Sequence, residues 1–328
     1  MTPGTIKKLR RLTQGVQSLC LPAAILLLIA LARVPGGSFS AYGKPQNAPS
    51  FALFRTRFAT VYALSEAAAQ KEADIEERFG VELVRDTGEL EPGGLEPGGL
   101  EPGGLDSPYR AAPCFDELKL YRALCSVESA LAACPEGFPR ALGLRLLLCG
   151  SIRSSSSAAP DFPAALTSGR GERITLAFDV TGGLEPHTVF HELCHAADRR
   201  IAASGFADEF AAGWEALAPP GFRYFGSYTD EKGFPLADTG DPAYTGEAET
   251  DPGRIWFLNR YSKTFPEEDR AVLFETLMRA GANSGLFRSP HIIMKLSYYF
   301  GSLRSFFDPD GLWPETEWEG RLRALTEN

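Results

Sequence analysis

The sequence predicts an α+β fold in which a small sheet supports several helices, one of them carrying the candidate site. Residues 173–180 alternate apolar and polar side chains, as a half-buried strand does. The residues from Pro186 onward have helical periodicity, with a broad apolar arc on one side and histidines on the other. Pro186 fits the first turn of that helix, where a missing N–H costs nothing.

The remaining elements follow from periodicity and from Gly and Pro signals. Before the candidate site we expect a helix at 50–77, a strand at 81–84, a helix at 115–133 and a strand at 142–149. After it we expect helices at 207–217, 266–280, 290–307 and 315–326. Residues 226–253 are rich in Gly, Pro and Asp and predict a long loop.

Two segments near the N-terminus suggest a division into parts. A basic stretch followed by the apolar run 19–32 is typical of a secretory signal, and the run is shorter than the about 20 residues that span a bilayer. The unit Glu-Pro-Gly-Gly-Leu occurs three times within 91–105 and predicts a flexible linker or surface loop. We therefore expect a signal peptide or N-terminal membrane anchor (1–40), a helical segment (41–87), a repeat linker or loop (88–107) and one domain (108–328).

This division predicts an extracytoplasmic protein, either secreted or anchored through its N-terminal segment. An oxidising compartment would allow two disulfides among Cys114, Cys125, Cys134 and Cys149, in any of three pairings. The formal net charge of −9 argues against a nucleic-acid partner, which requires a basic face. The oligomeric state stays open.

Within the candidate helix, His191, Glu192 and His195 form the pattern His-Glu-x-x-His. Two histidines one turn apart share a helix face and can bind one tetrahedral metal, and the Glu between them can act as a general base. Because the chain has four histidines and three of them fall within 187–195, the clustering itself favours a metal site. Cys194 falls on the apolar side and reads as a small core residue.

A zinc ion bound by two histidines needs a third protein ligand and an open position for water. Asp198 lies too far along the helix axis to reach the metal, and we interpret it as a partner of nearby polar groups. His187 lies near the helix start, and His291 follows Pro290 alone. A carboxylate from the helix at 266–280 is the strongest candidate. Glu267 suits the helix dipole, which leaves Glu268 on the same face as Ala271 and Glu275.

The HELCHAAD stretch, followed by the residues 261–274, resembles the lethal-factor-type zinc metallopeptidases of the gluzincin clan. In that pattern a Tyr precedes the third ligand by seven residues, and an Ala and a Phe follow it; Tyr261, Ala271 and Phe274 stand at those places. The resemblance implies a zincin-like fold, zinc ligation by Glu268 and a catalytic hydroxyl on Tyr261. One departure is Val272, where the family often has a second Glu, so another residue must perform that task.

These observations predict an exported zinc metalloendopeptidase that holds one Zn²⁺ per chain through His191, His195 and Glu268. Glu192 would take a proton from the zinc-activated water, Tyr261 would stabilise the oxyanion, and the substrate would be a peptide or protein. The strand at 173–180 could pair with an extended substrate. The alternative is a catalytically silent exported binding protein on a metallopeptidase-like scaffold, for which an intact Glu192 would have no use.

Overall fold

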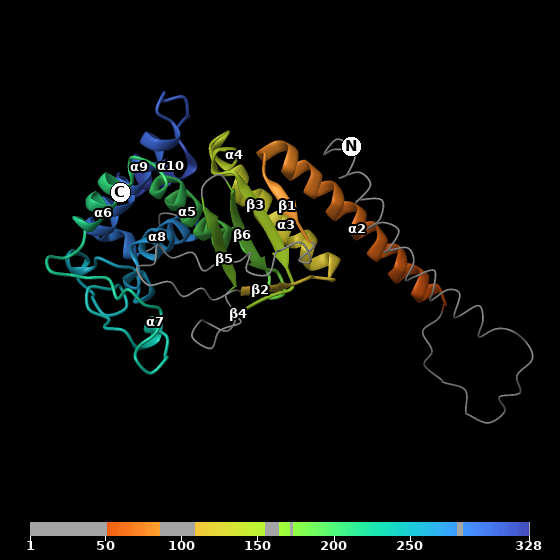
Figure 1. The fold of residues 1–328 in the computed structure, drawn as a ribbon, viewed down its shortest axis with the longest axis horizontal. Coiled ribbons are helices and arrows are strands. Elements are labelled where there is room, and N and C mark those ends of the chain that lie inside the picture. Colours follow the sequence, from red (N-terminus) through yellow and green to blue (C-terminus); the bar gives the residue numbers. More distant parts are fainter. Residues whose placement is uncertain (1–50, 86–108, 155–163, 171–172, 281–284, 328) are drawn as a thin grey trace, which may run out of the picture. The chain divides into compact units, whose positions relative to one another are not determined.

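The structure, a computed structural model, describes residues 51–85, 109–154, 164–170, 173–280 and 285–327 (Figure 1). The description below concerns the compact unit Thr56–Asn328. The predicted signal or anchor at 1–40 and the repeats at 91–105 lie outside the described residues. Among the helices that are described, none is both long enough and apolar enough to span a bilayer.

A four-stranded mixed sheet forms the framework of this unit. Its strands, in spatial order, are β1 (Glu82–Val84), β3 (Leu144–Cys149), β6 (Arg173–Asp179) and β5 (Ala165–Arg170). The first three run parallel, and β5 pairs antiparallel with β6 at the edge of the sheet. A second, two-stranded antiparallel sheet consists of β2 (Tyr109–Ala112) and β4 (Ser151–Ser154).

Both faces of the sheet are buried, which explains the nearly continuous apolar run in β3. Leu146 and Leu148 belong to the main core, which the helices share. Leu147 and Cys149 point to the opposite face and pack with Ile152 of β4 in a small second core. A strand covered on both sides loses the polar alternation of a half-exposed strand.

The helices of the structure are α2 (Phe51–Phe79), α3 (Glu117–Ala132), α4 (Phe138–Leu142), α5 (Pro186–Ala202), α6 (Ala207–Glu215), α7 (Leu236–Thr239), α8 (Pro266–Ala280), α9 (Pro290–Phe307) and α10 (Glu317–Thr326), with 3-10 turns η2 (Pro252–Arg254), η3 (Tyr261–Lys263) and η5 (Gly285–Arg288). Helix α5 contacts β5 and β6 on one side and α8 on the other (Figure 1). Helix α9 packs in turn against α8 and α10. The candidate helix α5 is therefore clamped between the sheet and the C-terminal helices.

Most predicted elements are confirmed, and the misses have local causes. Helices α8 and α9 have the predicted bounds, and α10 begins two residues later than expected. The strand expected from 142 begins at Leu144, because Leu142 is the last residue of α4 and Gly143 caps that helix with a left-handed backbone (φ 63°). The strands β2, β4 and β5 were not predicted. They are short, and β5 contains a Ser and a Gly, which are depleted in strands or weaken them.

The structure corrects the predicted substrate strand. Residues 173–180 do form β6, but this strand pairs with β3 on one side and with β5 on the other. Its backbone groups are already used on both sides, so it cannot also pair with a peptide. The strand beside the candidate helix that has a free side is β5.

The structure also corrects the expectation of disulfides. Cys114, Cys125, Cys134 and Cys149 are free thiols in the structure, where the sequence allowed two disulfides. Cys149 lies in the second core and donates to the carbonyl of Phe178 at 3.1 Å, while Cys114 and Cys134 pack against the main core. Cys194 is buried in the main core, as predicted.

Candidate metal centre

Helix α5 supplies two of the candidate metal ligands. Pro186 occupies its first turn, as expected from the fixed φ of proline. Its apolar side is buried in the main core through Val189, Phe190, Leu193, Cys194, Ala196, Ala197 and Ile201. Burial of this arc fixes the rotation of the helix about its axis. His191 and His195 therefore face α8 and are partly buried.

Three ligand atoms converge between α5 and α8. The Nε2 atoms of His191 and His195 are 3.1 Å apart, and Oε2 of Glu268 lies 3.2 Å from the first and 3.4 Å from the second. Tetrahedral zinc with ligands at 2.0–2.1 Å separates neighbouring ligand atoms by about 3.3–3.4 Å. The triangle thus has nearly the size that a zinc ion requires. Among the described residues, this is the group of His, Cys, Asp and Glu whose ligand atoms gather within 4.8 Å.

The two oxygens of the Glu268 carboxylate differ in their contacts: one accepts a hydrogen bond from the protein, and the other does not. The hydroxyl of Tyr228 donates to Oε1 at 2.7 Å. Oε2, which faces the two imidazoles, is buried and has no hydrogen-bond partner. When both imidazoles are neutral and turn an Nε2 lone pair toward it, this buried oxygen has no donor, which is costly because it has lost its hydration. The residues present therefore fit a metal ion, which would supply the missing positive charge to this oxygen.

A second carboxylate from α8 orients His191. Oε2 of Glu275 lies 3.0 Å from Nδ1 of His191, and Oε1 lies 3.6 Å from Nε2 of His187. A proton on Nδ1 donates to Glu275 and leaves Nε2 with its lone pair toward the other ligand atoms. This arrangement of carboxylate and imidazole is common around metal-ligating histidines. Glu275 therefore orients His191, a contact that the apolar side chain of Val272 could not make.

The electrostatics of the cluster favour bound positive charge. Burial lowers the pKa of His191, but the carboxylates of Glu268 and Glu275 outweigh burial and raise it to about 10. Burial likewise lowers the pKa of His195, and Glu268 reverses the direction. Burial raises the pKa of Glu268, yet the two imidazoles hold it well below its usual range. Without a metal the site binds protons tightly, and a metal ion would replace them.

The candidate general base, Glu192, is buried on the side of α5 that faces the sheet edge. Its Oε2 accepts a short hydrogen bond from the hydroxyl of Thr167 in β5. The same hydroxyl also lies 3.3 Å from the Glu192 carbonyl. The edge strand therefore fixes the orientation of this carboxylate.

The candidate hydroxyl donor, Tyr261, lies in the 3-10 turn η3 just before α8. Its ring stacks on that of His191, with centroids 6.4 Å apart, and on that of Tyr228 at 6.2 Å. Burial and the charge of Glu268 raise the pKa of Tyr261 well above its usual range, so the phenol keeps its proton. A protonated phenol beside the ligand triangle can donate to an oxygen that gains negative charge.

Three successive charged residues at the start of α8 fix this helix against its neighbours. Glu268 faces the histidines, Asp269 binds Lys295 of α9 at 2.6 Å, and Arg270 binds Asp198 of α5 at 2.7 Å. All are buried. Asp198 thus pairs with a guanidinium, in agreement with the prediction that it is a partner of polar groups.

The other predicted candidates lie apart from the ligand triangle. His291 stacks on Trp256 and contacts the carbonyl of Gly253. Sequence reasoning placed Glu275 on the same helix face as Glu268, seven residues earlier, but gave it no role. It missed Thr167 and Tyr228. Thr167 and Tyr228 lie in an unpredicted strand and in a long loop, where no periodic signal exists.

Comparisons with known proteins add little to this description. No protein-family profile matches the chain, and no curated protein matches it. Among solved structures, the chain is similar to a candidate zinc-binding metallo-peptidase from Bacteroides caccae, with 10% sequence identity and a TM-score of 0.43. The likeness covers 86% of this chain and 94% of the other. A likeness at this TM-score carries no argument about function.

Proposed function

We propose that the chain is a zinc metallopeptidase that hydrolyses peptide bonds. The observation that carries the proposal is the triangle of His191 Nε2, His195 Nε2 and Glu268 Oε2, whose sides of 3.1–3.4 Å suit tetrahedral zinc. The unpartnered Oε2 supports the same conclusion. Bound zinc would lower the pKa of water toward neutrality and polarise the scissile carbonyl.

The protein's own residues have distinct roles in the proposed reaction. Glu192 takes a proton from water and returns it to the leaving amine. Because Thr167 engages its Oε2, we assign the proton transfer to Oε1. Tyr261 donates its phenolic proton in a hydrogen bond to the oxyanion that forms at the carbonyl. Glu275 and Tyr228 hold His191 and Glu268 in position.

Two finer parts of the proposal rest on the sequence alone. The spacing of Tyr261, Glu268, Ala271 and Phe274 supports assignment to the lethal-factor-type gluzincins. The pattern of residues 1–40 supports export, either by secretion or by an N-terminal anchor. An extracytoplasmic peptide or protein substrate follows from these two inferences.

The proposal is tested with the full chain, its Glu192→Gln variant and, as a control, Glu185→Gln. Glu185 is an exposed carboxylate at the start of the same helix. Elemental analysis should find about one zinc per chain in all three proteins. Cleavage of a random decapeptide library, followed by mass spectrometry, should fall by about a thousandfold or more in Glu192→Gln and persist in the control.

Other outcomes have definite meanings. Undiminished cleavage by Glu192→Gln would contradict the assignment of the base. Zinc binding by the parent without cleavage of any library peptide would favour the silent binding protein. Absence of zinc from the parent would contradict the metal centre itself.

A further inference from the structure

The edge strand β5 lies directly beside the candidate general base, because Thr167 of this strand contacts Glu192 of α5. An extended peptide that paired with β5 would therefore lie next to the reacting groups. Such pairing needs outward-facing backbone N–H and C=O groups on the edge strand. The question is which of these groups are available.

The register identifies the outward-facing residues. The N–H of Asp179 donates to the carbonyl of Ala164 at 2.9 Å. In an antiparallel pair the residues bonded to the partner alternate, so 166 and 168 also face β6. Ala165, Thr167 and Gly169 then face away from the sheet.

Two of these three outward carbonyls already have a partner. Arg199 of α5, one turn beyond His195, donates from Nη2 to the Thr167 carbonyl at 2.9 Å and from Nη1 to the Gly169 carbonyl. The planar guanidinium thus occupies the places where a bound strand would donate its own N–H groups. The half-buried Arg199 side chain extends from α5, so the same helix supplies the candidate metal ligands and the group that covers these two carbonyls.

The backbone of β5 is irregular at the same place. Gly169 has a φ of 92°, a backbone conformation that residues other than glycine rarely adopt. This backbone departs from the extended geometry that a regular strand pair requires, and its carbonyl is one of the two that Arg199 binds. Both observations locate an interruption of the edge at Thr167–Gly169.

We propose that Arg199 closes the edge of β5 from Thr167 onward, so that the enzyme selects peptides by their side chains rather than by extended main-chain pairing. This inference rests on the proposed peptidase function and makes Arg199 a specificity-determining residue. Proteins also protect edge strands with charged side chains to prevent association, and that role alone would leave peptide selection unchanged.

The test uses the best-cleaved decapeptide from the library and derivatives that each carry one N-methylated amide. N-methylation removes a main-chain donor and keeps the side chain. The parent enzyme should cleave derivatives modified away from the scissile bond within about twofold of the unmodified peptide, measured as kcat/KM. In Arg199→Ala, modification of alternate amides should lower kcat/KM about five- to tenfold, the effect of about 1 kcal/mol per lost hydrogen bond.

Two further variants make the result interpretable. Arg199→Lys keeps the charge but cannot bridge two carbonyls with a planar fork, so it should show the same alternation more weakly. Arg200→Ala is the matched control, because Arg200 binds the Leu142 carbonyl away from β5. It should behave as the parent does. Melting temperatures identify any variant that fails to fold.

An alternating loss already present in the parent, or absent from both Arg199 variants, would overturn the role of Arg199. The proposed peptidase would stand in either case, since cleavage itself is retained. No cleavage by the parent or by any variant would overturn the peptidase function, and the closure of its substrate edge with it.

Discussion

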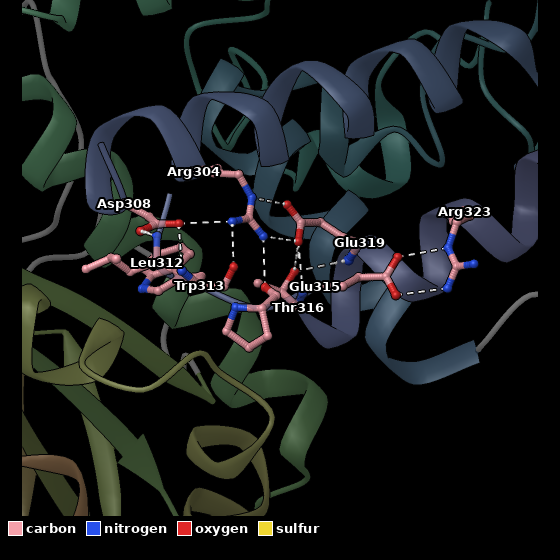
Figure 2. A network of polar contacts seen from close by, with 9 residues as sticks. Arg304, Asp308, Leu312, Trp313, Glu315, Thr316, Glu319 and Arg323 are labelled. Carbon is pink, nitrogen blue, oxygen red and sulfur yellow. Dashed lines mark hydrogen bonds and ion pairs between the residues drawn. The ribbon is translucent and has the colours of Figure 1, made fainter. Parts of the chain in front are cut away.

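Two polar clusters in this protein use similar side chains in opposite ways. In the first, between α9 and α10, Arg304 directs all five of its N–H donors to acceptors (Figure 2). The acceptors are the two carboxylate oxygens of Glu319, the carboxylate of Asp308, and the carbonyls of Trp313 and Pro314. Glu319 also accepts from the N–H and hydroxyl of Thr316. Donors and acceptors match.

The second cluster, between α5 and α8, gathers acceptors. Two imidazole nitrogens and one carboxylate oxygen approach within 3.1–3.4 Å of one another, and the carboxylate oxygen has no hydrogen-bond partner. The supporting residues Glu275 and Tyr228 are arranged around this triangle rather than within it. The comparison teaches that a cation site is recognised by acceptors that have no donor. In the Arg304 cluster each acceptor already has a donor, so that cluster has no acceptor left for a cation.

The largest expected effect comes from removing one corner of the acceptor triangle. Glu268→Ala should weaken zinc binding by about a thousandfold or more, because two histidines then bind without a carboxylate. Competition with a chromogenic chelator measures the Kd. Glu267→Ala, at the neighbouring position of α8, is the control and should bind as the parent does. Equal affinities in the two variants would remove Glu268 from the ligand set.

Breaking the matched cluster should affect stability and leave zinc binding unchanged. Arg304→Met removes five donors and should lower the free energy of unfolding by about 2 kcal/mol, because Asp308 and Glu319 lose their cation but keep other donors. Urea titration measures this change with and without zinc. A shift of similar size in zinc Kd would show that the two clusters are coupled.

The two clusters should also differ in their response to pH. Because the metal-free pKa of His191 is about 10 and that of His195 is also raised, zinc must displace the proton of each protonated imidazole, and affinity should fall about tenfold or more per unit decrease in pH below 10. The raised pKa also stabilises the metal-free fold below about pH 6.5, an effect lost as pH rises through 10. Calorimetry in buffers of different ionisation enthalpy measures the protons released. A pH-independent Kd between 6.5 and 8.5 would contradict this account.

The smallest effect is expected from the loop residue that holds the third ligand. Tyr228→Phe removes the hydrogen bond to Oε1 of Glu268 and should raise the zinc Kd about tenfold. The ring and its stacking on Tyr261 are kept, so the melting temperature of the metal-free protein should change little. Tyr244→Phe, in the same loop, is a suitable control. An unchanged Kd would mean that the loop does not position the ligand.

The sequence was sufficient for the parts of the site that depend on helical periodicity. The face shared by His191 and His195, and the placement of Glu268 on a neighbouring helix, needed local spacing and one family resemblance. The structure brings these residues together as expected. Helices are predictable in this way because their faces are set by residues three and four positions apart.

The residues that sequence reasoning missed come from segments that tertiary contacts position. Thr167 lies in a strand that exists through its pairing with β6, and Tyr228 lies in a loop whose path is fixed by distant groups. Lys263, for example, is buried and donates to the carbonyls of Asp241 and Ala243 within this loop. The local sequence does not predict such contacts, because the two residues of each contact are about twenty or more positions apart.

The three adjacent charges at the start of α8 have a consequence for how this segment can change in length. Glu268, Asp269 and Arg270 each contact a different partner, and successive helix positions point about 100° apart. Deleting or inserting one residue within 266–270 would turn all three side chains away from their partners at once. Residues 226–253 form a long connection in which such changes are tolerated more readily. Natural variation in chain length should therefore accumulate in that connection and be absent from the start of α8.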